Sequence, residues 1–181
     1  VHMRPDRFVD MFYVKGSTDF ENPDIEKQVR QMVVDWEAEE PKNRKLWEKV
    51  MQYSHDGQNL TLNRLGNVWD KVWHESDHYK KGKEMVELGI KKGVFKKSEG
   101  AIVTDLAKYN LTDTVVIKKD GTALYITQDL ALTKLKKEEY KADRMFWVIG
   151  PEQSLAMQQM FAVCEQLGIG KVSDFTHLAY G

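Results

Sequence analysis

The sequence predicts an α/β protein in which a mainly helical first region is followed by a parallel sheet with helices packed on it. Apolar residues recur at helical spacing through much of residues 1–92, whereas short β-branched runs alternate with helical stretches over residues 93–181. Alternation of strands and helices at these lengths implies right-handed crossovers and a parallel sheet. We therefore expect two regions, 1–92 and 93–181.

Three helices are expected in the first region. The first spans Asp24–Ala38, and Pro41 interrupts the helical pattern behind it. The second covers about Asn43–Ser54, with its apolar residues on one side. The third covers about Asp77–Lys92, where Gly93 is well placed to end it.

The second region begins with short strands at residues 94–95, 100–104 and 114–118. The dipeptide Asp120-Gly121 is typical of a tight turn, so residues 114–118 and 123–126 are predicted to form a hairpin. In this prediction Tyr125 lies at the end of a strand.

The last third is predicted to alternate helices and strands. Thr127 is suited to cap a helix that runs to about Leu135, and a second helix is expected at Gln153–Gly168. Strands are expected at Met145–Ile149 and Asp174–Tyr180. Ligands of such sheets bind beyond the carboxyl ends of the strands, so residues 125–129, residues 150–153 and Gly181 are expected along one edge.

Composition limits the class of protein. With 181 residues, 41% of them hydrophobic, the chain can bury a core, and 27 basic against 28 acidic residues argue against a dedicated nucleic-acid-binding module. The single cysteine, Cys164, lies in an apolar run and is expected to be buried and unreactive. No long uncharged apolar run indicates a membrane segment.

Standard phosphate-binding and metal-binding signatures are absent from the sequence. Neither GxxxxGK[ST] nor GxGxxG occurs. His74 and His78 are four residues apart, which suits a metal on a helix, but no third ligand accompanies them. We therefore predict no metal site.

Three unlike polar residues are expected at the proposed edge of the sheet: Tyr125, Asp129 and Gln153. A carboxylate with a hydroxyl and an amide could bind a planar cation in a water-poor pocket. Each residue also has a structural interpretation, since Asp129 could complement a helix dipole, Tyr125 could belong to the core and Gln153 could lie on the surface. From the residues alone, the structural interpretation is favoured.

A resemblance to a known family reverses that preference. The run Lys118–Ala131 (KKDGTALYITQDLA) resembles the segment K-x-D-G-x-x-x-Y-x-T-x-D-[LI]-A of arginyl-tRNA synthetases. Ala142–Gln153 is similar to the family's A-D-R-…-V-x-G-x-[ED]-Q, and His177–Gly181 (HLAYG) to its H-x-x-[YF]-G. Further upstream, residues 13–15 (YVK), residues 62–66 (LNRLG) and Glu75-Ser76 resemble other family segments in the same order.

The resemblance implies a role for each matching residue. Tyr125 and Asp129 would recognise the guanidinium of arginine, and Gln153 would hold the α-amino end of the amino acid. His177 and Gly181 would lie against the adenosine of ATP. The expected fold is the second half of a class I synthetase core, a Rossmann-like parallel sheet behind a mainly helical, insertion-like region.

The resemblance also implies the activity of the parent enzyme, a cytoplasmic arginine–tRNA ligase that activates arginine with ATP and Mg²⁺ and transfers it to tRNA. The sequence departs from the family where G-E-S reads His74-Glu75-Ser76, and it contains neither the H-x-G-H signature nor a K-M-S-K-S-type loop. These elements stabilise the transition state, so no catalytic residue is assigned here and the chain alone is expected to be inactive. A non-catalytic, synthetase-derived arginine-binding or assembly module is the alternative, and another nucleotidyl transferase of the same superfamily is a third.

Overall fold

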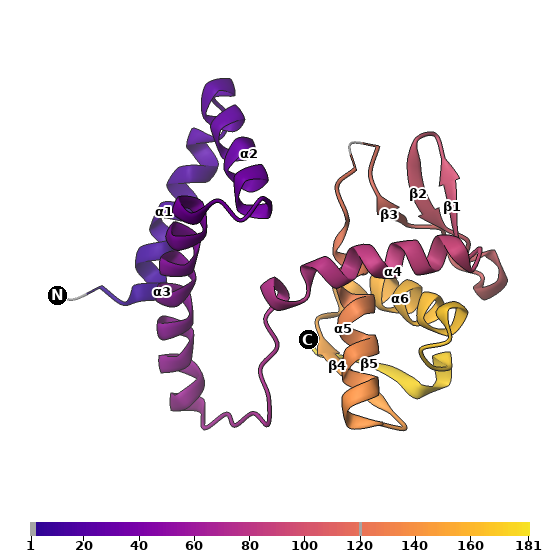
Figure 1. Ribbon diagram of the computed structural model, residues 1–181. Helices are drawn as coiled ribbons and strands as arrows, with labels where there is room; N and C mark the ends of the chain where they lie inside the picture. The colour runs from indigo at the N-terminus through magenta and orange to yellow at the C-terminus, as the bar shows by residue number, and fades with distance from the viewer. Residues whose placement is uncertain (1–2, 120) are drawn as a thin grey trace. The chain divides into compact units, whose positions relative to one another are not determined.

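The structure is a computed structural model that describes residues 3–119 and 121–181. The chain divides into two compact units, Val1–Val72 and Trp73–Gly181 (Figure 1). The sequence suggests a domain boundary between residues 92 and 93, and this boundary stays a prediction. The contacts divide the chain earlier, so the helix that precedes residue 92 belongs to the second unit.

From residue 3 onward, the first unit forms three helices, α1 (Pro5–Asp19), α2 (Pro23–Glu37) and α3 (Pro41–Leu65). Each begins with a proline, whose missing N–H has no helical partner to lose in the first turn. Pro41 therefore starts a helix, and α3 extends well beyond the predicted 43–54. Gly66, in the left-handed conformation with φ 74°, ends α3.

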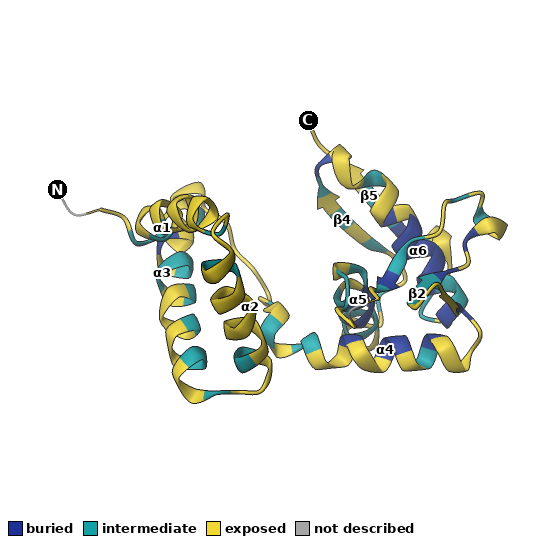
Figure 2. Cartoon of the chain, turned by 90° about the horizontal axis from the view of Figure 1, so that it is seen from above, coloured by how far each residue is buried: buried dark blue, intermediate teal, exposed yellow. Residues whose placement is uncertain are grey.

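Helices α1 and α3 pack closely at Gly57. A Cβ at this position would lie 2.3 Å from the side chain of Asp6, so only glycine fits. Arg4 stabilises the same contact between the two helices. Its guanidinium donates to the carbonyl of Gly57 at 2.7 Å and to the carboxylate of Asp6 at 2.8 Å. Among the described residues of this unit Gly57 alone is buried, and its apolar side chains are half-buried or exposed (Figure 2).

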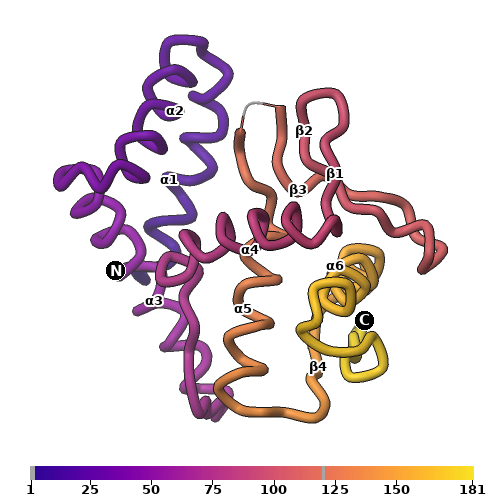
Figure 3. The backbone as a smooth tube through the Cα atoms, turned by 45° about the vertical axis from the view of Figure 1, so that its right-hand side comes forward, coloured from indigo at the N-terminus to yellow at the C-terminus, as the bar shows by residue number. Residues whose placement is uncertain are grey.

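The described residues of the second unit, 73–119 and 121–181, form two small sheets and three longer helices. Its helices are α4 (Tyr79–Lys91), α5 (Tyr125–Tyr140) and α6 (Ser154–Leu167), with short 3₁₀ helices at Glu75–Asp77, Ala107–Tyr109, Pro151–Gln153 and Val172–Asp174. Its strands are β1 (Phe95–Ser98), β2 (Ala101–Thr104), β3 (Val115–Ile117), β4 (Met145–Ile149) and β5 (Phe175–Ala179). Helix α4 packs across α5 (Figures 1 and 3).

The parallel pairing predicted for the last third is confirmed, and among the described residues it joins two strands. Strands β4 and β5 run parallel, with Met145 opposite Phe175 and Ile149 opposite Ala179. Strands β1, β2 and β3 form a separate antiparallel sheet in chain order.

The predicted hairpin is wrong in its second strand. A single bridge joins Ile117 to Ala123, and Tyr125 already opens α5 instead of closing a strand. Thr127 does not cap this helix; its hydroxyl donates to the carbonyl of Leu124 at 2.8 Å from inside the first turn. Asp120, half of the proposed turn, lies outside the described residues.

Helix α6 is the centre of the core of the second unit. Its apolar face is buried against β4, β5 and the neighbouring helices, and Cys164 is fully buried there as predicted. Burial raises the pKa of the Cys164 thiol to about 12, so the sulfur stays protonated and unreactive.

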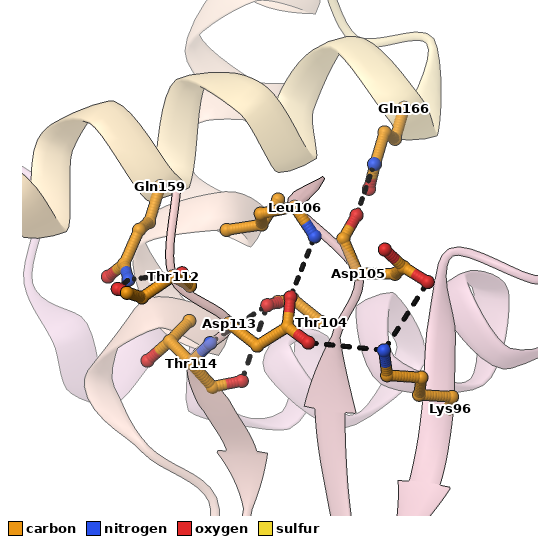
Figure 4. Close-up of polar contacts among 9 residues, drawn as sticks. All are labelled: Lys96, Thr104, Asp105, Leu106, Thr112, Asp113, Thr114, Gln159 and Gln166. Carbon is orange, nitrogen blue, oxygen red and sulfur yellow. Dashed lines mark hydrogen bonds and ion pairs between the residues drawn. The ribbon is translucent and has the colours of Figure 1, made fainter. Parts of the chain in front are cut away.

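Polar contacts fasten the segment between β2 and β3 to this core (Figure 4). From α6, Gln159 donates to the carbonyl of Thr112 at 2.8 Å and Gln166 to the carbonyl of Asp105 at 2.7 Å. Lys96 of β1 lies between two carboxylates, 3.3 Å from Asp105 and 3.1 Å from Asp113. The loop is therefore held from both the sheet and the helix.

Candidate functional site

A cavity of about 150 Å³ opens at the beginning of α5. This is roughly the volume of five water molecules, enough for the head group of a long side chain. Two segments far apart in the sequence form it, the segment before α4 and the first two turns of α5. Its lining combines two carboxylates, a phenol, an amide and three rings or apolar groups: Trp73, Glu75, His78, Tyr125, Gln128, Asp129 and Leu132.

Helix α5 brings together the two residues that the sequence singled out most strongly. Tyr125 is the first residue of the helix and Asp129 follows one turn later, so both project from the same face. Tyr125 is 77% exposed, and Asp129 also reaches solvent at the mouth of the cavity. The change from strand end to helix start therefore does not separate this pair.

The segment before α4 contributes residues that the sequence analysis did not assign to a site. Glu75 begins the short 3₁₀ helix Glu75–Asp77, and His78 follows it. The rings of Trp73 and His78 lie 5.2 Å apart between centroids, tilted by 49°. The sequence signal for this wall is the Glu75-Ser76 match, which directly follows the departure from the family pattern at His74.

The electrostatics of the cavity favour a cation. Removal from water raises the pKa of Asp129, the negative charge of Glu75 raises it further, and Lys136 opposes the shift. A positively charged ligand would offset the repulsion that disfavours the ionised form of Asp129. Lys136 itself is half-buried, and that burial lowers its pKa.

The other predicted site residues lie elsewhere in the second unit. Gln153 is exposed at the end of the 3₁₀ helix Pro151–Gln153, immediately before α6, and does not line the cavity. His177 of β5 is half-buried, and its Nε2 lies 2.9 Å from the carbonyl oxygen of Ile149 at the end of β4. Gly181 is exposed at the end of the chain. The functions suggested for these residues stay predictions.

His74 and His78 flank the 3₁₀ helix Glu75–Asp77 and so do not share a helical face. Over residues 3–119 and 121–181, no three or more His, Cys, Asp or Glu residues are grouped as a metal site requires. Within the same residues, no helix is long and apolar enough to traverse a bilayer.

Residues 4–181 match the family model described as "tRNA synthetases class I (R), catalytic domain". The chain belongs to this family. It is 37% identical over 184 residues to the arginine–tRNA ligase of Treponema denticola, covering 99% of this chain and 31% of that protein. It is 35% identical over 156 residues to the arginine–tRNA ligase of Bacteroides thetaiotaomicron, covering 86% of this chain and 26% of that protein.

The solved structure of the arginyl-tRNA synthetase from Plasmodium falciparum has the same fold. It matches with a TM-score of 0.75 at 14% sequence identity, over 87% of this chain and 28% of that one. The predicted class, α/β with a helical first region within a class I synthetase domain, is thereby confirmed. The chain spans about a third or less of the length of these synthetases.

Proposed function

We propose that this chain supplies the arginine-recognition part of an arginine–tRNA ligase. The whole protein would activate arginine with ATP, as its complex with Mg²⁺, and transfer the arginyl group to tRNA in the cytoplasm. The observation that carries the proposal is the meeting of Tyr125 and Asp129 with Glu75 in one cavity.

The chemistry of the cavity suits a guanidinium group. Arginine presents five N–H donors and no acceptor, so its ideal partners are acceptors in fixed positions. The carboxylates of Asp129 and Glu75 and the phenol oxygen of Tyr125 are such acceptors. Lysine carries the same charge on a compact ammonium, which cannot reach several separated acceptors at once. The site would therefore select arginine by geometry as well as by charge.

The amino acid's α-amino end and the nucleotide would bind at the carboxyl ends of β4 and β5. Gln153 follows β4 by four residues, and His177 contacts the last residue of that strand. In α/β sheets this edge is where ligands bind. We assign Gln153 to the α-amino group, and His177 and Gly181 to the adenosine, on the strength of the family motifs they match.

Arginine binding by this chain tests the assignment. We expect NMR titration with arginine to give saturable shifts in the first turn of α5, whereas lysine at equal concentration gives none. Asp129→Ala should abolish the arginine shifts, because it removes one of the two carboxylates that pair the cation's charge in a partly desolvated cavity. Asp143→Ala removes an exposed carboxylate outside the cavity and serves as the control. Equal binding by the Asp129 variant would refute the site.

Adenylate formation is expected to need more than this chain. The sequence contains no H-x-G-H signature to stabilise the pentacoordinate phosphorus. ATP–pyrophosphate exchange in the presence of arginine should therefore remain at background. Appreciable exchange would show that residues of this chain are sufficient for activation.

A further inference from the structure

One side of the cavity is aromatic, and the hydrogen bonds proposed for arginine do not involve it. Trp73 and His78 line it from the segment before α4, with their rings 5.2 Å apart. Trp73 is half-buried, and it does not belong to the apolar core cluster that α4, α5 and α6 build within the described residues. It lines the cavity, where its ring is within reach of a ligand.

His78, the second ring on this side, also has a polar atom that the described residues leave unpaired. Its Nδ1 atom is buried and makes no hydrogen bond with any group in the described part of the chain. A buried polar atom without a partner costs free energy, and such atoms in native proteins call for a functional explanation.

We propose that Trp73, held by His78, is a specificity-determining residue that stacks on the planar face of the guanidinium. This inference rests on the proposed arginine site and adds to it. The carboxylates and the phenol can satisfy only the edge of the guanidinium, where its N–H groups point. Its two faces are weakly hydrated and are attracted to aromatic rings, tryptophan most strongly.

The stacking adds a requirement for a flat ligand to the selection that the acceptors already provide. A tetrahedral ammonium cannot present a flat face to Trp73 and direct donors to Asp129 and Glu75 at the same time. A neutral planar analogue such as citrulline can stack, but it lacks the charge that the two carboxylates require. The ring and the carboxylates together therefore define a ligand that is both planar and cationic.

Arginine titrations of matched tryptophan variants test the proposal. Trp73→Leu removes the ring but keeps apolar bulk, and it should weaken arginine binding by about 3- to 30-fold, the range of a cation–π contact. Trp73→Phe keeps a π face and should lose less than the leucine variant. Trp69→Leu changes an exposed tryptophan of the first unit and should leave the affinity unchanged.

A spectroscopic readout separates stacking from a purely structural role. In wild-type protein labelled with 5-fluorotryptophan, the five tryptophans give five ¹⁹F resonances, and the one missing from Trp73→Phe belongs to Trp73. Arginine should shift that resonance and saturate with the same midpoint as the amide shifts. The δ-methylene protons of bound arginine should move upfield by the ring current in wild type.

The outcomes distinguish this inference from the proposed function. If wild type binds arginine and Asp129→Ala does not, yet the Trp73 resonance stays still and Trp73→Leu binds normally, the stacking is refuted and the site stands. If wild type shows no saturable arginine binding, the site itself is refuted and the stacking with it. Should Trp73→Leu fail to fold, the ¹⁹F measurement on wild type and the Trp73→Phe titration still decide.

Discussion

The two units of this chain obey the same local rules and differ in what they bury. The first unit has well-marked helices, each started by a proline and two of them capped by a side chain from Asn22 or Glu40. Yet among its described residues only Gly57 is buried, whereas in the second unit α6 alone buries eight residues (Figure 2). Signals that start and stop helices are local, and they say nothing about whether a helix gains a core.

The apolar faces of the first unit lie open as grooves. One of about 510 Å³ runs between α2 and α3, and one of about 410 Å³ runs between α1 and α3. Leu46 and Val50 of α3 line both grooves. The contacts that do hold these helices include the edge-on pair Trp36 and Trp47, with ring centroids 5.2 Å apart. We therefore expect the first unit to be the less stable of the two.

The largest expected difference in stability is between truncation of a buried leucine in the second unit and truncation of a half-exposed leucine in the first. Leu130 of α5 is 0% exposed, so Leu130→Ala should lower the free energy of unfolding of the second unit by about 2–5 kcal/mol. Leu46 is 49% exposed, and Leu46→Ala should cost less than about 1 kcal/mol. Urea titration followed by backbone amide NMR reads the two units separately. Equal losses would mean that the first unit has a core comparable to the second.

A pair of glycines within the first unit should respond with opposite signs. Gly16→Ala in α1 meets nothing within 4 Å and should stabilise the helix by about 0.5–1 kcal/mol. Gly57→Ala in α3 places a Cβ 2.3 Å from Asp6, so the clash should outweigh that gain and separate α1 from α3. Thermal unfolding monitored by circular dichroism compares the two. If both substitutions stabilise the protein, the side chain of Asp6 can move away from residue 57 at little cost in free energy.

The smallest effect on stability, and the one most linked to function, concerns Asp129. Its pKa is raised above the ordinary 3.8 in the folded protein, so the folded state binds the proton more tightly than the unfolded state. Stability should therefore fall as pH rises from about 3.8 through the folded pKa. Asp129→Asn removes this penalty, so its melting temperature should exceed that of wild type at neutral pH, and the gap should close on acidification.

Arginine provides the control for that experiment. It should raise the melting temperature of wild type and leave Asp129→Asn unchanged, which reverses the order of the two proteins at saturating arginine. An asparagine variant that is less stable at pH 7 without ligand would show that Asp129 serves the fold.

Much of the site was visible in the sequence, and the remainder depended on long-range contacts. Tyr125 and Asp129 were singled out, and they do share a cavity, because four residues along a helix return to the same face. Trp73 and His78 were missed as parts of this site because they come from a segment about fifty residues earlier. No spacing rule connects that segment to α5.

The wrongly predicted strand at 123–126 has a similar cause. Tyr125-Ile126-Thr127 has the β-branched and aromatic character of a strand, and locally a hairpin is a reasonable expectation. In the fold Thr127 is buried against α4 at Gly82, where an added Cβ would lie 3.1 Å from its hydroxyl oxygen. Close packing of α4 on α5 thus favours an early helix start over the local preference.

Sequence patterns were enough to predict the family, the parallel pairing of Met145–Ile149 with the last strand and the burial of Cys164, and they singled out Tyr125 and Asp129, which share a cavity. These follow from short-range patterns and from motifs that keep their order. Long-range packing sets where α5 begins, which residues line the cavity opposite Asp129 and which of the two units has a core. Each of these depends on residues far apart in the chain competing for the same buried space, a competition that local propensity does not record.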